Sequence, residues 1–424
     1  GRFPMERITV AIAGCGARGM DTYADKLASL PDRAQIVAAA DVNPEKLELM
    51  RRRYGLTEAQ CFASAEEMLA QPKLADVMFI CTPDRCHYAE AKEALRKGYH
   101  LLLEKPISPV EAECRELKAL ATEKRLQVVV CHVLRYTPFY RKIKEIVDSG
   151  ILGEVESVQA NEQVRYWHQA HSFVRGNWRN SELSSCMILQ KCCHDMDILL
   201  WLTGKHLKKV SSFGSLRHFR AENAPVGSPE RCIEGCPAQD ECPYDAVRFY
   251  LNRYETRGDS WPVNVVAPDP TEGKLLKALR EGPYGRCVYK CDNDVVDHQV
   301  VLMELEDGLT VDFTMCAFTA HGGRQIRIMG TRGELVGDME AETIRVMPFI
   351  GEEELIDVRT LSDDFSGHGG GDGRLVTSFL DLLQGTEKLD PALSSIDRSV
   401  ESHVAAFAAE QSRVSGGHLV EVSL

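Results

Sequence analysis

The feature that most constrains the fold is a glycine-rich turn between a short apolar run and a more polar stretch. Residues 8–13 are rich in β-branched side chains, and Gly14-Cys15-Gly16-Ala17-Arg18-Gly19 follows them directly. In a strand–turn–helix unit, the first glycine permits the tight turn, the second admits a phosphate and the third allows close packing. The free N–H groups at the helix start then face an anion. This pattern predicts a dinucleotide site that includes Ala17 and Arg18 beside the three glycines.

Similar units continue through the first third of the chain. Apolar runs alternate with amphipathic stretches: the runs cover 35–40, 75–81, 100–103 and 126–130, and the stretches cover 44–53, 64–70, 87–97 and 109–124. Apolar strands that alternate with helices indicate a parallel sheet covered on both faces. Right-handed crossovers make it doubly wound, with its ligand at the carboxyl ends of the strands. We assign residues 5–135 to this Rossmann domain and 136–424 to a second domain.

Polar residues follow several of these runs. Asp41 lies 22 residues after Gly19 and ends the second run. A carboxylate there binds ribose hydroxyls and repels a 2′-phosphate, so NAD is favoured over NADP, although Arg51–Arg53 weaken this preference. Cys81-Thr82-Pro83 and Glu104-Lys105-Pro106 end two further runs, so they are expected at the same edge of the sheet. The remaining predicted cofactor contacts are Cys81, Thr82, Pro83, His87, Glu104 and Lys105.

These motifs together resemble the glucose-fructose oxidoreductase, inositol dehydrogenase and rhizopine-catabolism (Gfo/Idh/MocA) family. The resemblance extends to His194-Asp195-Met196-Asp197 and Gly367–Gly371, and leaves out about 217–286. It implies an α/β protein whose Rossmann domain precedes an α/β domain with a large, open, mostly antiparallel sheet. It also implies NAD(P)-dependent chemistry on a sugar or polyol hydroxyl, and a homo-oligomer that is a dimer or tetramer.

The second half independently predicts such a sheet. Residues 300–306 and 309–318 form one predicted hairpin, and 324–329 and 334–337 form another. We also expect one long strand over 154–167. Helices are expected over 187–202, 374–383 and 394–412.

Lys105, His194 and Lys191 are the catalytic candidates. The resemblance places Lys105 beside the nicotinamide, where its ammonium can stabilise an alkoxide. His194 is the candidate base, because its unperturbed pKa lies near neutrality. The family pattern has an aspartate four residues before this histidine, whereas this chain has Gln190 followed by Lys191. Glutamine cannot take a proton, so Lys191 or another histidine takes over part of the role. Without the resemblance, a buried helix histidine is the commoner explanation of His194.

Aromatic and polar residues in the second domain suggest a carbohydrate site. The alternative is a loop that packs its own aromatic side chains. The predicted substrate contacts are Arg135, Tyr136, Tyr166, His168, Arg175, Trp178, Gln190 and His368.

A cysteine-rich insertion spans about 217–291. Three or four thiolates at close spacing can hold a structural zinc, which would supply folding energy to a segment with little core. Free thiols, a disulfide and an iron–sulfur cluster remain alternatives. The candidate metal ligands are Cys232, Cys236, Cys242, Cys287 and Cys291.

Composition excludes several classes of protein. The chain is 44% apolar and 27% charged, with a net charge of −13, so we expect no nucleic-acid partner. No apolar run reaches the roughly 18 residues that span a membrane. Fifteen cysteines, many inside apolar runs, suit a reduced cytoplasmic protein. Residues 1–4 resemble an expression scar.

The sequence therefore predicts an NAD-dependent oxidoreductase that acts on a secondary hydroxyl of a small-molecule carbohydrate. One alternative is an NAD-dependent glycoside hydrolase that works by transient C3 oxidation, elimination, hydration and re-reduction. A second alternative is a non-catalytic NAD-binding sensor.

Overall fold

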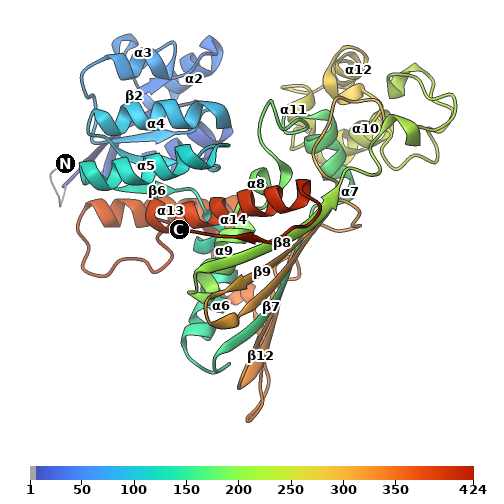
Figure 1. Ribbon diagram of the computed structural model, residues 1–424. Coiled ribbons are helices and arrows are strands. Elements are labelled where there is room, and N and C mark those ends of the chain that lie inside the picture. The colour runs from blue at the N-terminus through green and yellow to red at the C-terminus, as the bar shows by residue number, and fades with distance from the viewer. Residues whose placement is uncertain (1–5) are drawn as a thin grey trace.

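The computed structural model describes residues 6–424, so the predicted expression scar at 1–4 and the predicted domain start at residue 5 lie outside it. Its first unit is a parallel sheet with strand order β3-β2-β1-β4-β5-β6 (Figure 1). The strands are β1 Ile8–Ala13, β2 Ala34–Ala40, β3 Cys61–Phe62, β4 Val77–Ile80, β5 His100–Leu103 and β6 Val128–Val130. The predicted Rossmann sheet is confirmed. Only β3 was missed, because two residues carry no periodic pattern.

The connecting helices follow the predicted amphipathic stretches closely. They are α1 Asp25–Ala28, α2 Pro44–Tyr54, α3 Ala65–Ala70, α4 His87–Arg96 and α5 Glu111–Lys124. Helix α2 shows why: the Asn43 side chain accepts the amide hydrogen of Glu45 at 2.9 Å, and Gly55 ends the helix in the left-handed region.

The second sheet has nine strands in the order β14-β13-β12-β11-β7-β10-β9-β8-β15. Its strands are β7 Val155–Gln163, β8 Leu207–Ser215, β9 His298–Leu305, β10 Thr310–Cys316, β11 Gly323–Gly330, β12 Gly333–Asp338, β13 Thr343–Pro348, β14 Glu354–Asp357 and β15 Val420–Glu421. Among the described strands of this sheet, only β7 and β10 pair in parallel. Both predicted hairpins are confirmed. The long strand predicted over 154–167 is wrong at its end, because Arg165 has φ of 85° and Tyr166–His168 is helical.

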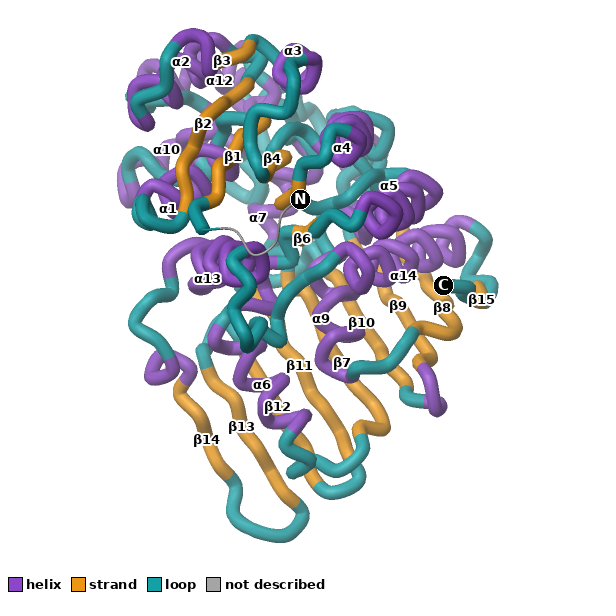
Figure 2. The backbone as a smooth tube through the Cα atoms, turned by 90° about the vertical axis from the view of Figure 1, so that its left-hand side faces the viewer, coloured by secondary structure: helices purple, strands orange, loops and turns teal. Residues whose placement is uncertain are grey.

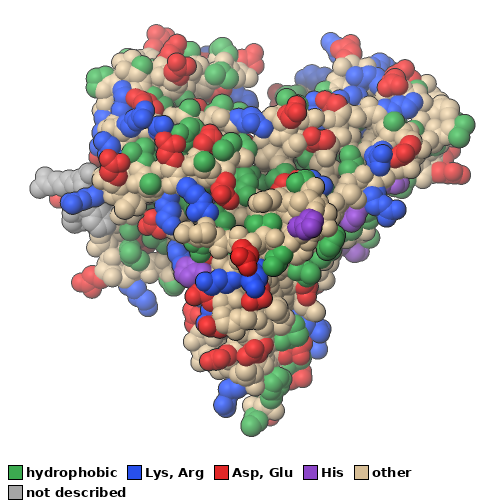
Figure 3. Space-filling model, in the orientation of Figure 1, with side chains coloured by type: hydrophobic (Ala, Val, Ile, Leu, Met, Phe, Trp, Pro, Cys, Tyr) green, Lys and Arg blue, Asp and Glu red, His purple; other side chains and the backbone are tan. Residues whose placement is uncertain are grey.

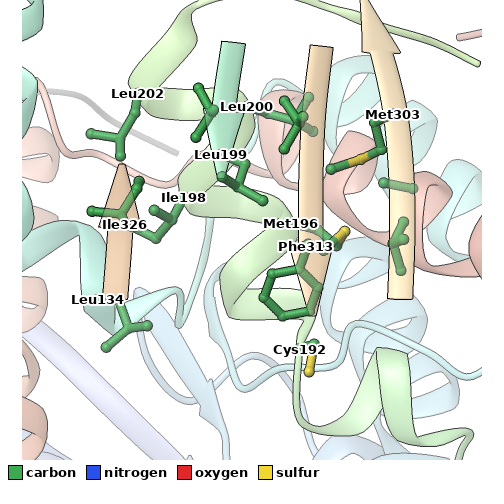
Figure 4. Packing of buried hydrophobic residues seen from close by; sticks show 14 of the residues in the cluster. Leu134, Cys192, Met196, Ile198, Leu199, Leu200, Leu202, Met303, Phe313 and Ile326 are labelled. Atoms are coloured by element: carbon green, nitrogen blue, oxygen red, sulfur yellow. The ribbon is translucent and has the colours of Figure 1, made fainter. Parts of the chain in front are cut away.

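Helices cover one face of the second sheet. They are α6 Pro138–Asp148, α9 Cys193–Thr203 and α14 Ile396–Val414, and Figure 2 shows them on the side of the first sheet. Met196 and Leu199 of α9 pack near Met303, Phe313 and Ile326 of the strands (Figure 4). The predicted helix 187–202 is divided into α8 Met187–Gln190 and α9, and Lys191 and Cys192 lie at the division.

Two helices from the end of the chain complete the core of the first unit. Leu375 and Phe379 of α13 (Ser366–Leu383) pack with Phe79 of β4, and Val400 of α14 packs with Leu117 of α5. Residues on both sides of the predicted boundary at 135/136 therefore contribute to the hydrophobic core of the first unit.

The cysteine-rich insertion lies between β8 and β9 and forms a separate lobe (Figure 1). Its helices are α10 Ala246–Arg257, α11 Val263–Val266 and α12 Glu272–Glu281. No helix in the described part of the chain is long and apolar enough to span a membrane.

Candidate functional site

The three glycines of the turn have different surroundings. Gly14 has φ of 95°, and a Cβ on it would lie 2.5 Å from the carbonyl oxygen of Cys81. A Cβ on Gly19 would lie 1.8 Å from the carbonyl oxygen of Gly14. Around Gly16, no atom lies within 4 Å of such a Cβ. Packing thus requires the outer two glycines, whereas the middle one faces the open space that a pyrophosphate needs.

Asp41 is held against this turn. Its Oδ2 accepts the amide hydrogen of Cys15 and its Oδ1 accepts that of Asn43, both at 2.7 Å. The carboxylate therefore lies at the carboxyl end of β2, beside the glycine turn. This is the position from which a carboxylate binds ribose hydroxyls.

Arg18 follows the turn in the π-helix η1 (Ala17–Ala24) and connects three segments. Its guanidinium lies 2.8 Å from Oε1 of Glu104, 3.0 Å from Oδ1 of Asp372 and 2.6 Å from the Tyr23 hydroxyl. Burial raises the pKa of Glu104, but the Arg18 charge outweighs it and the net pKa is lowered. Two carboxylates thus balance the charge of Arg18, and its predicted cofactor contact stays a prediction.

The loops after β4 and β5 are tied together by His87. One ring nitrogen lies 2.7 Å from the carbonyl oxygen of Pro106, and the other lies 2.7 Å from that of Thr82. The Thr82 hydroxyl donates to Glu90 at 2.6 Å. His87 thereby fixes the loop that carries Lys105, and both of its ring nitrogens are already used.

Lys105 joins the two sheets at the centre of the site. Its Nζ donates to the carbonyl oxygen of Gln190 at 2.9 Å. Gln190 ends α8, and His194 follows one helical turn later. The structure therefore brings together the lysine and the histidine helix that the sequence placed about 90 residues apart.

His194 is buried and poised as a neutral imidazole. Its Nδ1 has no hydrogen-bond partner among the described residues, and its ring centre lies 6.0 Å from that of His132. Burial lowers the pKa of His194 well below its usual value, and the Lys105 charge acts in the same direction. The imidazole is thus deprotonated at neutral pH and can accept a proton.

Lys191 lies in a buried network of charges. Its Nζ is 4.0 Å from Oε1 of Glu162. Arg324 bridges Glu162 at 2.8 Å and Asp195 at 2.7 Å. Burial lowers the pKa of Lys191 although Glu162 opposes it, and burial raises the pKa of Glu162. This network holds Lys191 beside Glu162, directly after Gln190.

The Gln190 side chain connects the two sides of the site. With its amide oriented to suit its neighbours, it accepts from Trp178 Nε1 at 3.1 Å and donates to Ser185 at 3.2 Å and to Asp84. Trp178 is 39% exposed, so its ring remains available to a ligand. Burial raises the pKa of Asp84.

Three of the predicted substrate contacts form hydrogen bonds within the protein. Arg135 is buried and bonds to Asp197 at 2.5 and 2.7 Å. The Tyr136 hydroxyl is buried against Ser394 at 2.9 Å. Arg175 is buried against the insertion and donates to the carbonyl oxygens of Arg286 and Tyr244 at 2.8 and 2.6 Å. These side chains already have partners within the protein, and their contact with a substrate stays a prediction.

The remaining predicted contacts lie at the edges of the site. Tyr166 packs near Tyr244, with ring centres 6.1 Å apart. His168 lies 5.0 Å from the Trp261 ring, and burial lowers its pKa to about 2. His368 is about half exposed, 3.1 Å from Asp372. These three positions form two separate clusters, one beside the insertion and one beside Arg18.

The zinc prediction is not supported. In residues 6–424, no three His, Cys, Asp or Glu side chains are grouped so that they could hold a metal ion. Cys232, Cys236, Cys242 and Cys287 instead line one small cavity, and Cys291 is not part of its lining. The physical reason is that a single ion needs its ligands to converge on one point.

The site lies between the lobes of the molecule. Figure 3 shows a hollow between the first sheet with its helices and the lobe of α10–α12, and α8 lies beneath it in Figure 1. Sequence reasoning missed four of its residues: Asp84, His132, Glu162 and Arg324. Only Asp84 had a signal, since it follows Pro83 at a strand end.

Comparisons with known proteins agree with this geometry. The model of an oxidoreductase family with an NAD-binding Rossmann fold matches residues 8–132, and its C-terminal α/β domain matches 144–419. YteT of Bacillus subtilis, assigned as an oxidoreductase, is 25% identical over 374 residues, 84% of this chain and 83% of YteT. Inositol 2-dehydrogenase of Ralstonia nicotianae is 24% identical over 46% of this chain and 55% of its own.

A solved structure shows the same fold. The WlbA dehydrogenase of Bordetella pertussis, in complex with NADH and UDP-GlcNAcA, superposes with a TM-score of 0.71 at 17% identity and covers all of both chains.

Proposed function

The chain belongs to the Gfo/Idh/MocA oxidoreductase family, and on this premise we propose that it transfers hydride between NAD and a secondary hydroxyl carbon of a sugar or glycoside. The observation that carries the proposal is the 2.9 Å hydrogen bond from Lys105 to Gln190. It joins the edge of the nucleotide-binding sheet to the segment that leads into His194. A reacting hydroxyl at this junction meets a cation and a neutral imidazole together.

The glycine turn and Asp41 would hold the cofactor. Gly16 offers open space to the pyrophosphate, and Asp41 offers a carboxylate to the ribose. When bound, NAD supplies the hydride acceptor. Asp41 also favours NAD over NADP, because a 2′-phosphate would meet its negative charge.

Lys105 orients the substrate in this mechanism. An ammonium has three N–H donors, and one of them is used by Gln190, so two remain for the reacting oxygen. As the hydroxyl loses its proton, the positive charge stabilises the alkoxide. His194 takes that proton, because it is already deprotonated at neutral pH, whereas Lys191 is engaged by Glu162.

The assignment of the base is tested by a pH profile. A base whose pKa is well below 6.5 stays deprotonated above that pH, so kcat is flat between pH 6.5 and 8. Lys191→Met keeps that flat shape. A rate that rises with pH in the native protein and becomes flat in Lys191→Met would assign the proton to Lys191 instead.

The carbohydrate class is supported by Trp178. Its ring is partly exposed and its Nε1 is held by Gln190, so a rigid aromatic face borders a polar site. Sugar sites combine such a face with a few directed hydrogen-bonding groups.

The function is tested with a panel of sugars and aryl glycosides in the presence of NAD. We expect net NADH formation with the glycosidic bond intact. Release of the aglycone without net NADH would show the redox glycosidase instead. Binding of NAD without either product over the whole panel would show a sensor.

We also propose a homo-oligomer, a dimer or a tetramer, that forms through the uncovered face of the second sheet. Along β9, buried residues alternate with exposed ones, and Val300 and Leu302 are 37% and 47% exposed. Sedimentation velocity tests this: a monomer at micromolar concentration would contradict it. The cytoplasmic location and the lack of nucleic-acid and membrane partners stay predictions.

A further inference from the structure

We propose that Cys232, Cys236, Cys242 and Cys287 bind a [4Fe–4S] cluster inside the insertion. The four thiols are free in the structure and line the same small cavity. They come from segments up to 55 residues apart in the chain. The proposal does not depend on the hydride chemistry, because it concerns a different lobe of the molecule.

The backbone around the cavity is held independently of any ligand. The amide of Cys287 donates to the carbonyl oxygen of Glu230 at 2.9 Å, and Arg231 and Arg286 form a short antiparallel bridge. The amide of Cys242 donates to the carbonyl oxygen of Ala238 at 2.9 Å. The segment with Cys287 is therefore held beside the segment with Cys232, and their thiols are free.

A buried positive charge gives a second, independent sign of an anion in this cavity. Arg175 lines it and is 2% exposed. Its guanidinium donates to two carbonyl oxygens and lies 3.6 Å from Sγ of Cys232. Within residues 6–424, no carboxylate oxygen lies within the 4.0 Å of an ion pair with Arg175, although Asp245 also lines the cavity. A buried charge is costly unless it is paired, and thiolates on a metal centre would supply the missing negative charge.

Four thiols line one cavity, and four is the number of thiolates that a [4Fe–4S] cluster takes. Sulfur ligands of one zinc ion lie about 2.3 Å from it and so crowd around one point. No group of three potential ligands in the described chain is arranged in this way. In a [4Fe–4S] cluster each thiolate binds a different iron, so the four sulfurs stand around a core rather than a point. Each S–H bond breaks as the thiol binds iron, and its proton passes to solvent. Two ferrous irons, two ferric irons and four sulfide ions make up the core, so no further oxidant or reductant is needed.

Cys291 provides a natural control within the same lobe. Its Sγ lies 3.2 Å from the carbonyl oxygen of Cys287, and it does not line the cavity. Of the five cysteines that the sequence suggests as metal ligands, four line the cavity and Cys291 does not.

The cluster would also order a loop of the candidate active site. Arg175 ends the π-helix η5 (Gln169–Arg175), and the amide of Trp178 donates to the carbonyl oxygen of Ser172 at 3.2 Å. Through Trp178, this segment reaches Gln190. The cluster would thus position Trp178 and Gln190 without contact with the substrate.

The test is metal and sulfide analysis of the full chain purified without oxygen, both as isolated and after reconstitution with sulfide and equal amounts of ferrous and ferric iron. We expect about four iron and four sulfide per chain, with a broad visible absorption that dithionite bleaches. Cys236→Ser and Cys242→Ser lose most of the iron, whereas Cys291→Ser keeps it. NAD binding, measured on every variant, reports whether the first domain is folded.

Three outcomes would overturn the proposal. One is a colourless protein with one zinc per chain that resists reconstitution. Another is mass-spectrometric evidence that the four cysteines pair in disulfides after anaerobic purification. The third is an iron content that Cys291→Ser lowers as much as Cys236→Ser does.

Discussion

Buried arginines have different partners in the cleft and beside the insertion. In the cleft, buried Arg135 pairs with Asp197, and Arg324 pairs with Glu162 and Asp195. Against the insertion, buried Arg175 donates to two carbonyl oxygens and lies near a thiol, and no carboxylate of the described residues forms an ion pair with it. The buried cations of the cleft therefore have carboxylate partners, whereas Arg175 has none. The proposed cluster would supply the missing negative charge.

The largest effect is expected when Lys105 is replaced, because kcat should fall while NAD binding is retained. Lys105→Ala should lower kcat by about 10³-fold, because the alkoxide loses its cationic partner. NAD affinity, measured by fluorescence titration, and iron content should stay unchanged. Lys124→Ala, on the exposed end of α5, is the matched control. Turnover that survives in Lys105→Ala would remove Lys105 from the mechanism.

The next prediction concerns the completed ion pair. Asp197→Ala should lower the free energy of unfolding by about 3–5 kcal/mol, because Arg135 would remain buried without a partner. Urea unfolding at pH 7 measures this change. The double variant Arg135→Met, Asp197→Met should recover much of the loss. If the single and double variants are equally unstable, charge pairing is not what distinguishes the cleft.

Buried histidines make the cleft sensitive to acid. Burial lowers the pKa of His132 to about 4 and that of His403 to about 3. The unfolded chain binds protons at a higher pH, so their contribution to stability is complete above about pH 6.5 and is lost as the pH falls. For His132 alone the loss by pH 4 is about 3 kcal/mol. In urea unfolding over this range, His132→Phe should show a shallower pH dependence, and an unchanged slope would contradict the assignment.

The smallest expected effect concerns the cofactor. Asp41→Asn should weaken NAD binding by about tenfold, or about 1.4 kcal/mol, and improve NADP binding relative to NAD. The amide oxygen can keep only part of the contacts with Cys15 and Asn43. Asp32→Asn, at an exposed position, is the control. Equal affinities for NAD in both variants would remove Asp41 from the cofactor site.

Much of the first sheet could be predicted because its signals are local. The run 8–13 and the turn after it specify a strand, a bend and a helix start within twelve residues. The hairpins of the second sheet were equally local, since alternation and a turn suffice. The division between α8 and α9 was not predicted, because the apolar pattern continues through Lys191 and Cys192.

The surroundings of several site residues could not be predicted from the sequence. Arg135, Tyr136 and Arg175 have the chemistry of ligand contacts, but each is buried against a partner far away in the sequence. Glu162 and Arg324 gave no signal, because they look like ordinary strand residues until β7 and β11 pair.

By itself, the sequence determined the alternation of strands and helices, the glycine turn and the family resemblance, because these depend on neighbours within one or two turns. Only the tertiary structure decided that Lys105 meets Gln190, that four cysteines share one cavity and that Arg175 is buried beside them. Such contacts depend on which distant segments pack together, and burial, rather than residue type, sets the charge state of each group.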